Sequence, residues 1–415
     1  MKFAIVGAGA IGLEHIRNIQ ILDGSQVTAV ADPVEKSQEW AKQILNKNNN
    51  NNNNVQYVND YKELFTMDNV DTLIICTPNY HHINVLRDAI VHSNKNILCE
   101  KPLCTTIEDC IEVRNLVKKY FTLGSQRMFW VGMEYRYIKS IDRLINEVDK
   151  GTVGDLHMVS IREHRFPFLK KVGTWNRLKK NTGDTLVEKC CHFFDLMNRI
   201  AGAEYFPQRV IASGGQSVNH LTEVYNGEKA DILDNAYVIV EFDNRGPRML
   251  LELCMFAEAS KNQEEISIVG NKGKLEAFAP AHQMKSKRDE DEVQPNFRVG
   301  LRQLPWRDRV APPPPSTVEE FYEGADAKIL SAGYHEGATY FELLDFVTKS
   351  LKRDGIPTVD VDDGLLAVTL GVAAHISIDE KRICEIDSLL SKDLIDELRT
   401  NRLLHREQIT MANKI

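Results

Sequence analysis

The first 120 residues alternate between short apolar runs and amphipathic stretches. Strand-length apolar runs begin at Lys2, Gln26, Val70 and Asn96, and helical periodicity follows, most clearly over Ile107–Tyr120. Strands that alternate with helices are typical of a parallel sheet covered on both faces. We therefore expect an α/β domain with a doubly wound parallel sheet over residues 1–126.

The pattern changes after Gln126. Apolar strand-like runs such as "FWVGMEYRY", "NAYVIVEFD" and "EEISIVG" are now separated mostly by turns, which indicates an open antiparallel or mixed sheet. One strong helix is expected between them, at about 186–200, and further helices are expected near the C-terminal end. The sequence predicts a second α/β domain over 127–385 and a helical extension over 386–415.

An asparagine tract interrupts the first domain. Residues 46–54 contain almost only asparagine and offer no apolar side chain to bury. We expect a disordered insertion between a helix and the next strand, with no role in function.

Composition excludes several classes of protein. The chain has 415 residues, 43% of them apolar, and a net charge of −8, which disfavours nucleic-acid binding. No apolar run approaches the length of a membrane span, and the glycines at the start favour a buried strand over a signal peptide. Eight scattered cysteines fit a reducing compartment, so we expect a cytoplasmic protein.

A glycine motif follows the first strand. Gly7, Gly9 and Gly12 form G-x-G-x-x-G at the start of a helix, and Asp32 ends the next strand twenty residues later. This context predicts a dinucleotide site, with the pyrophosphate at the helix N-terminus. Asp32 accepts ribose hydroxyls and repels a 2′-phosphate, so NAD is favoured over NADP. The expected binding residues here are Gly7, Gly9, Ala10, Ile11, Gly12 and Asp32.

Two polar segments follow the next strands, at the sheet edge where ligands bind. "CTPNYHH" offers Thr77, Asn79 and His82, and "EKP" offers Glu100 and Lys101. Beside a nicotinamide cation Lys101 should have a lowered pKa and act as an acid, a base or an oxyanion partner. The alternative is an ordinary surface lysine.

The stretch "EKCCHFFD" lies within the helix expected at 186–200. Glu188, His192 and Asp195 share one helical face at i, i+4 and i+7. A zinc site needs three or four ligands from more than one element, so no metal is expected. Cys190 and Cys191 could form a strained disulfide, but packing is favoured.

Together these motifs resemble the Gfo/Idh/MocA oxidoreductases over about residues 1–380. The resemblance implies an N-terminal Rossmann domain and a C-terminal domain with an open mixed sheet. It assigns the catalytic lysine, carboxylate and histidine to Lys101, Glu188 and His192. Two departures stand out: Asp184 replaces a glycine, and Glu188 replaces the family's aspartate.

The same resemblance suggests weaker candidates. Arg136 in "GMEYRY" could approach the cofactor, or it could be a paired structural arginine. Trp175, in the polar and aromatic segment 162–177, could stack on a sugar.

The function implied by the resemblance is NAD-dependent dehydrogenation of a sugar, an inositol or a related polyol. In that reading Lys101 and His192 handle the proton, and Glu188 orients the imidazole or binds a neighbouring hydroxyl. Two alternatives stay open: an NAD-dependent glycosidase that oxidises its substrate transiently, and a non-catalytic dinucleotide-binding regulator. A homo-oligomer, dimeric or tetrameric, is also expected.

Overall fold

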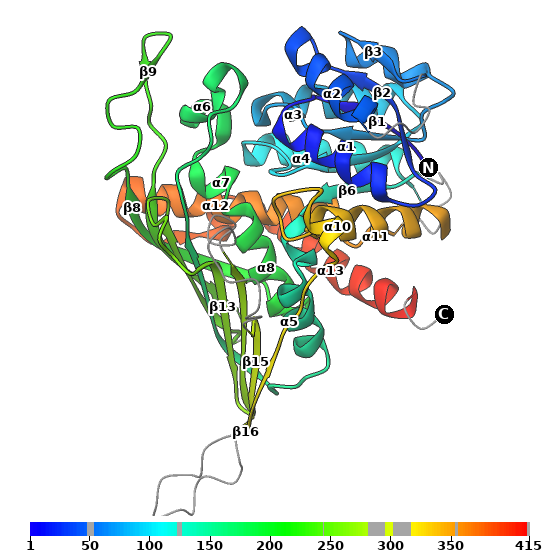
Figure 1. Ribbon diagram of the computed structural model, residues 1–415. Coiled ribbons are helices and arrows are strands. Elements are labelled where there is room, and N and C mark those ends of the chain that lie inside the picture. The colour runs from blue at the N-terminus through cyan, green and yellow to red at the C-terminus, as the bar shows by residue number, and fades with distance from the viewer. Residues whose placement is uncertain are drawn as a thin grey trace, which may run out of the picture.

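The computed structural model describes residues 1–47, 54–122, 127–243, 245–280, 295–301, 317–352 and 356–412 (Figure 1). Helix α2 (Glu35–Lys47) ends inside the asparagine tract. The prediction of disorder is therefore wrong for residues 46 and 47, while residues 48–53 of the predicted insertion lie outside the described residues.

The N-terminal part is built on a six-stranded parallel sheet. Its strand order is β3-β2-β1-β4-β5-β6, the doubly wound order of dinucleotide-binding domains. This confirms the predicted fold class of the first domain. The strands are β1 (Lys2–Val6), β2 (Gln26–Ala31), β3 (Gln56–Val58), β4 (Thr72–Ile75), β5 (Asn96–Glu100) and β6 (Phe129–Gly132). The remaining helices of this part are α1 (Ala10–Ile21), α3 (His82–His92) and α4 (Ile107–Tyr120).

Strand β6 lies in a different sheet from the one the sequence pattern indicated. The run that begins at Phe129 pairs in parallel with β5, so it completes the first sheet. The parallel sheet therefore extends to Gly132, beyond the expected boundary at residue 126.

The C-terminal part is built on a nine-stranded sheet of order β16-β15-β14-β13-β7-β12-β11-β8-β17. All neighbours are antiparallel except β12 and β7, which makes the sheet mixed, as predicted. Its strands are β7 (Leu156–His164), β8 (Pro207–Gly215), β11 (Asn235–Phe242), β12 (Arg248–Cys254), β13 (Asn262–Gly270), β14 (Gly273–Pro280), β15 (Phe297–Leu301), β16 (Thr317–Phe321) and β17 (Cys384–Glu385). A small hairpin, β9 (Val224–Tyr225) and β10 (Glu228–Lys229), stands apart.

Helices cover one face of this sheet (Figure 1). Side chains alternate along β11, so Ala236, Val238 and Val240 are buried beneath the helices while Tyr237 and Ile239 face outward. The helices of this part are α5 (Lys139–Asp149), α6 (Lys179–Thr182), α7 (Thr185–Glu188), α8 (Cys191–Ala201), α10 (Ala327–Leu330), α11 (Ala338–Lys352), α12 (Val361–Glu380) and α13 (Lys392–Ala412).

Helix α12 lies between the two sheets. By length and composition alone it could cross a membrane, but 78% of its apolar window is buried inside the protein. It packs on α4 from the first part and on α7, α8 and β8 from the second. Such a helix is apolar all round because it is surrounded by protein.

The last helix, α13, contacts both parts. Arg402 donates to the backbone carbonyls of Asn198, Gly202 and Tyr205, which satisfies carbonyl groups at the end of α8. Glu397 pairs with Arg114 of α4 at 3.0 Å. The C-terminal residues thus brace the helix that carries His192.

Candidate active site

The glycine loop between β1 and α1 has the geometry of a phosphate cradle. Gly7 has φ +94°, and a side chain on Gly12 would lie 2.1 Å from the carbonyl oxygen of Gly7. At Gly9, by contrast, a Cβ would meet no atom within 4 Å, so open space lies above the loop. Asp32 is fixed at the end of β2, where its carboxylate accepts from Ala8 N and Val34 N, both at 2.8 Å.

Thr77 and Asn79 present polar atoms beside this loop. Thr77 Oγ1 and Asn79 Nδ2 are buried and have no hydrogen-bond partner among the described residues. Buried polar groups normally have partners, so these two atoms fit the role of ligands to a bound dinucleotide. His82 has a different place: its Nδ1 is 2.8 Å from Pro102 O and its Nε2 is 3.1 Å from Thr77 O. The imidazole therefore connects the loop that follows β4 with the loop that follows β5.

Lys101 follows β5 and points into the space between the two parts of the chain. Its Nζ donates to the backbone carbonyl of Glu188 at 3.3 Å. Burial acts to lower the pKa of Lys101, but Cys191 and the carboxylates of Glu134 and Glu100 outweigh it and raise the pKa. The prediction of a lowered pKa for Lys101 is therefore wrong for the groups that the chain itself supplies. Lys101 is held as a cation.

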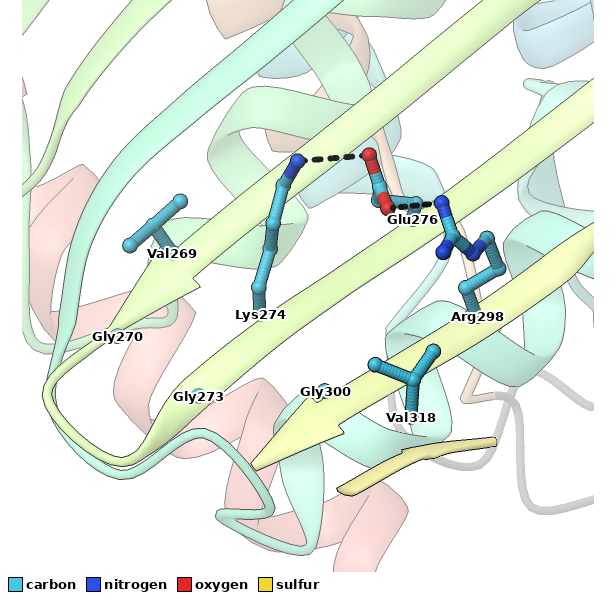
Figure 2. Close-up of a pocket in the computed structure, with 8 residues that line it drawn as sticks. All are labelled: Val269, Gly270, Gly273, Lys274, Glu276, Arg298, Gly300 and Val318. Atoms are coloured by element: carbon cyan, nitrogen blue, oxygen red, sulfur yellow. Dashed lines mark hydrogen bonds and ion pairs between the residues drawn. The ribbon is translucent and has the colours of Figure 1, made fainter. Parts of the chain in front are cut away.

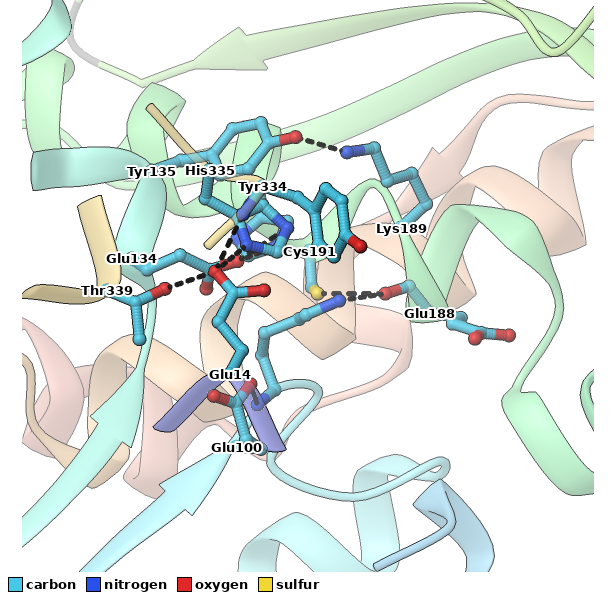
Figure 3. Close-up of polar contacts among 12 residues, drawn as sticks. Glu14, Glu100, Glu134, Tyr135, Glu188, Lys189, Cys191, Tyr334, His335 and Thr339 are labelled. Carbon is cyan, nitrogen blue, oxygen red and sulfur yellow. Dashed lines mark hydrogen bonds and ion pairs between the residues drawn. The ribbon is translucent and has the colours of Figure 1, made fainter. Parts of the chain in front are cut away.

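The helix expected at 186–200 is interrupted. Helix α7 ends at Glu188, and α8 begins at Cys191. The prediction that Glu188 shares one continuous helical face with His192 and Asp195 is therefore wrong. The Glu188 carboxylate instead accepts from Lys171 Nζ at 3.1 Å, and Figure 3 shows the side chain extending away from the neighbouring carboxylates.

His192 meets a different carboxylate. Its Nε2 lies 3.4 Å from Glu134 Oε1, and its ring stacks on Tyr135 with centroids 4.1 Å apart. Burial, then the positive charges of Lys101 and Lys189, hold the pKa of His192 well below its ordinary value. The imidazole is therefore neutral and available as a base.

Glu14, on α1, forms a second polar centre (Figure 3). Glu14 Oε1 accepts from Tyr334 N, His335 Nδ1 and Thr339 Oγ1 at 3.2, 2.9 and 3.0 Å. Burial alone would raise the pKa of Glu14, but the charge and hydrogen bond of His335 lower it to about 2. Burial would likewise lower the pKa of His335, but Glu14 and then Glu134 raise it to about 9.

Sequence reasoning missed these residues. Glu14 lies two positions after the glycine motif, and Glu134 lies in the same "GMEYRY" segment as Arg136. These neighbouring motifs are the sequence signals that could have pointed to both residues. His335 lies more than 300 residues from Glu14, and no motif marks it.

Arg136 is a paired structural arginine, the second of the two predicted alternatives. It is buried, and its Nη2 lies 2.5 Å from Asp195 Oδ1 and 3.1 Å from Asp363 Oδ2. The predicted cofactor contact is thus replaced by an ion cluster that joins η3 (Glu134–Tyr137), α8 and α12. Asp195, expected on the catalytic face, is part of this cluster.

The same cluster contains a group with the spacing of metal ligands. Ligand atoms of Asp360, Asp363 and His405 lie within 4.8 Å of one another. Arg136 already neutralises Asp363, and His405 Nε2 lies 2.7 Å from Pro357 O. These partners account for the group without a cation.

Asp184, the first departure from the family pattern, occupies a glycine-like conformation. Its φ is +69°, a region that L side chains rarely adopt. Its Oδ1 accepts from Thr185 N at 2.6 Å and from Leu233 N at 2.8 Å. The side chain caps α7 and anchors a neighbouring loop, which offsets the backbone strain.

The remaining candidates have clear surroundings. Cys190 and Cys191 are buried free thiols, and burial is the largest cause that raises the pKa of Cys191 to about 12. Trp175 packs edge-on against Tyr80, with ring centroids 6.2 Å apart, and Lys171 Nζ lies 4.6 Å from its ring centroid. The segment 162–177 therefore borders the loop that holds Thr77 and Asn79.

This fold and this cradle define a dinucleotide-binding oxidoreductase. Residues 1–124 match the family domain described as "Oxidoreductase family, NAD-binding Rossmann fold". Residues 145–386 match "Oxidoreductase family, C-terminal alpha/beta domain". The chain belongs to the Gfo/Idh/MocA family, which confirms the resemblance.

Relatives carry several names. Myo-inositol 2-dehydrogenase of Thermotoga maritima is 24% identical over 392 residues, covering 94% of this chain and all of that protein. Inositol 2-dehydrogenase/D-chiro-inositol 3-dehydrogenase of Halalkalibacterium halodurans is 31% identical, covering 49% of this chain and 54% of that protein. The 2,7-anhydro-N-acetylneuraminate hydratase of Mediterraneibacter gnavus is 27% identical, covering 58% and 60%.

Solved structures share the fold. Levoglucosan dehydrogenase in complex with NADH has a TM-score of 0.71 at 17% identity, covering 93% of this chain and 99% of that one. Apo scyllo-inositol dehydrogenase of Lactobacillus casei has a TM-score of 0.67 at 18% identity, covering 93% and 98%.

The Glu14–His335 pair predicts a pH dependence of stability. The pKa of His335 is raised from 6.5 to about 9, so its contribution is complete below pH 6.5 and is lost as pH rises through 9. The pKa of Glu14 is lowered from 4.5 to about 2, so its contribution is present above pH 4.5 and is lost as pH falls through 2. The free energy of unfolding of the wild type, measured in urea, should therefore fall between pH 6.5 and 9.

The matched variants are His335→Gln and the exposed His157→Gln. His335→Gln should be less stable at pH 6.5 and should show a flatter profile up to pH 9, whereas His157→Gln should follow the wild type. An unchanged slope in His335→Gln would contradict the ion pair.

Proposed function

We propose that this protein is an NAD-dependent dehydrogenase that oxidises a hydroxyl of a sugar, an inositol or a related polyol. One observation carries the proposal: Lys101 Nζ, from the first part, lies 3.3 Å from the Glu188 carbonyl, four residues before His192, and its charge lowers the pKa of that histidine. A neutral base beside a fixed cation suits the removal of a hydroxyl proton. The names of the inositol and levoglucosan dehydrogenases support the substrate class.

In this proposal each residue has one task. His192 takes the proton of the substrate hydroxyl, and the Lys101 ammonium stabilises the charge that develops on the oxygen. Glu188, paired with Lys171, binds a neighbouring hydroxyl of the substrate instead of orienting the imidazole. Gly7, Gly9, Ala10, Ile11 and Gly12 hold the dinucleotide, with Thr77 and Asn79 as polar ligands. NAD, when bound, supplies the hydride acceptor.

The catalytic assignment is tested by substitution. Lys101→Ala and His192→Ala should each lower kcat by roughly 10²–10⁴, because each removes a proton-transfer or charge-stabilising group. Lys62→Ala, an exposed lysine paired with Asp88, is the matched control and should keep wild-type kcat. The assay is NADH formation at 340 nm with a panel of sugars, inositols and sugar acids. Wild-type turnover by His192→Ala would overturn the assignment.

The cofactor preference rests on Asp32. Its carboxylate is fixed at the end of β2, where it meets the ribose hydroxyls of NAD and repels a 2′-phosphate. Calorimetric titration should show NAD bound at least about tenfold more tightly than NADP, a difference of about 1.4 kcal/mol. Asp32→Ser should narrow that gap. Equal binding of the two dinucleotides by the wild type would contradict the role of Asp32.

One alternative has specific support. The relative named 2,7-anhydro-N-acetylneuraminate hydratase shows that the relatives do not all carry the name of a dehydrogenase. An enzyme that oxidises its substrate transiently, such as an NAD-dependent glycosidase, would consume substrate without net NADH. Product analysis with glycosides of the same sugars separates the two, because only a glycosidase releases the free sugar without net NADH. The third possibility, a regulator, has no use for Lys101 and His192 together.

We further propose that the uncovered face of the nine-stranded sheet joins two copies of this chain. The outward side chains of Met158, Tyr237 and Ile239 are 60%, 57% and 38% exposed. Figure 2 shows a groove on the sheet where Lys274 and Arg298 flank Glu276. Apolar patches beside paired charges suit a self-complementary dimer interface.

Light scattering tests this interface. The wild type should have a mass that is a multiple of 47.2 kDa, because the patch is buried between copies. The double variant Met158→Glu, Ile239→Glu should shift toward 47.2 kDa, while Leu344→Glu, an exposed position on α11, should not. A monomeric wild type would contradict the proposal.

A further inference from the structure

A carboxylate that the family resemblance did not point to lies against the candidate base. Glu134 follows β6 and is buried, with only 4% of its surface exposed. Its Oε1 lies 3.4 Å from His192 Nε2 and 3.7 Å from His335 Nε2. Its Oε2 has no hydrogen-bond partner among the described residues. Glu134 thus stands between two imidazoles.

The ring of His192 is fixed in plane and direction. Tyr135 stacks on it with an interplanar angle of 9°, so the ring cannot tilt freely. Nε2 lies 3.4 Å from Glu134 Oε1, and a carboxylate oxygen at that position favours the neutral tautomer with its proton on Nε2. Nδ1 then carries the lone pair, and it has no hydrogen-bond partner within the described part of the chain. The nitrogen that can accept a proton is the one left without a partner.

His335 holds Glu134 from the other side. Its Nδ1 donates to Glu14 Oε1 at 2.9 Å, so Nε2–H is turned toward Glu134. Gly333 permits this approach, because a Cβ at that position would lie 2.3 Å from Glu14 Oε1. Carboxylates and imidazoles therefore alternate from α1 to the candidate base, in the order Glu14, His335, Glu134 and His192.

We propose that Glu134 is a positioning residue for His192: it holds the imidazole with Nε2–H toward itself and Nδ1 toward the substrate hydroxyl. The inference rests on the proposed function. When the substrate O–H bond breaks, the proton goes to Nδ1, and the Glu134 carboxylate stabilises the imidazolium without taking a proton. His335, gripped by Glu14, keeps Glu134 in place.

Two variants should move the pH profile in opposite directions. Besides Glu134 at 3.4 Å and the stacked ring of Tyr135, the charges that act on the pKa of His192 are those of Lys101, Lys189, His335 and Arg165, and each of them lowers it. Glu134→Gln removes the negative charge, so the imidazolium is less stable and the acid limb of kcat moves to lower pH. His335→Gln removes a cation, so the acid limb moves to higher pH.

The kinetic experiment uses myo-inositol and NAD as probes. Glu134→Gln should lower kcat by roughly 10–100-fold with KM changed less than about threefold, and Glu134→Asp should recover part of the loss. Glu342→Gln is the matched control, because Glu342 is also buried but accepts a hydrogen bond from Trp130 Nε1. A Glu134→Gln enzyme with wild-type kcat and acid limb, tested beside an inactive His192→Ala, would overturn the role of Glu134 alone. Activity retained in both variants would overturn the proposed function.

A second readout does not require turnover. Nitrogen-15 NMR of histidine-labelled wild-type protein with NAD, assigned through His192→Ala, reports the tautomer of His192 near pH 7.5. The Nε2–H tautomer is expected. An Nδ1–H tautomer would overturn the proposal even if myo-inositol is not turned over, because Nε2 would then carry the lone pair against a carboxylate.

Discussion

An ionised carboxylate buried on the cofactor helix is the constraint on which the site depends. Glu14 is almost without solvent contact, and an unpaired charge there would cost several kcal/mol. Its donors come from the segment 334–339, more than 300 residues later in the chain. The first helix of the parallel sheet is therefore tied to the segment that leads into α11, and the space between the two parts of the protein is fixed by that tie.

The charges around this tie bear on the protonation of Lys101 and His192. Cys191 and the carboxylates of Glu134 and Glu100 raise the pKa of Lys101 against its burial, whereas burial, with the charges of Lys101 and Lys189, lowers the pKa of His192. Burial alone would favour the neutral form of both groups, so it is the neighbouring charges that separate them. A base and a fixed cation then coexist a short distance apart, as in other sites that pair an acid with a base.

The sequence predicted what depends on local pattern. The glycine loop, Asp32, Lys101 and His192 all belong to short motifs, and the structure places the first three after strands β1, β2 and β5 and His192 on α8. The interruption at Lys189–Cys190 escaped prediction because apolar residues continue across it at helical spacing. Arg136 was ambiguous because its partners, Asp195 and Asp363, are set by tertiary packing.

The pairing of early and late residues has a consequence for synthesis on the ribosome. Strands β1 to β6 are complete once 132 residues have been made, so the parallel sheet can form early. At that stage Glu14 still lacks the donors of residues 334–339, and α8, made later, lacks Arg402 until α13 emerges. The nascent chain therefore carries a formed sheet with a solvated Glu14, and Glu14 gains its donors only after residue 339 has been made.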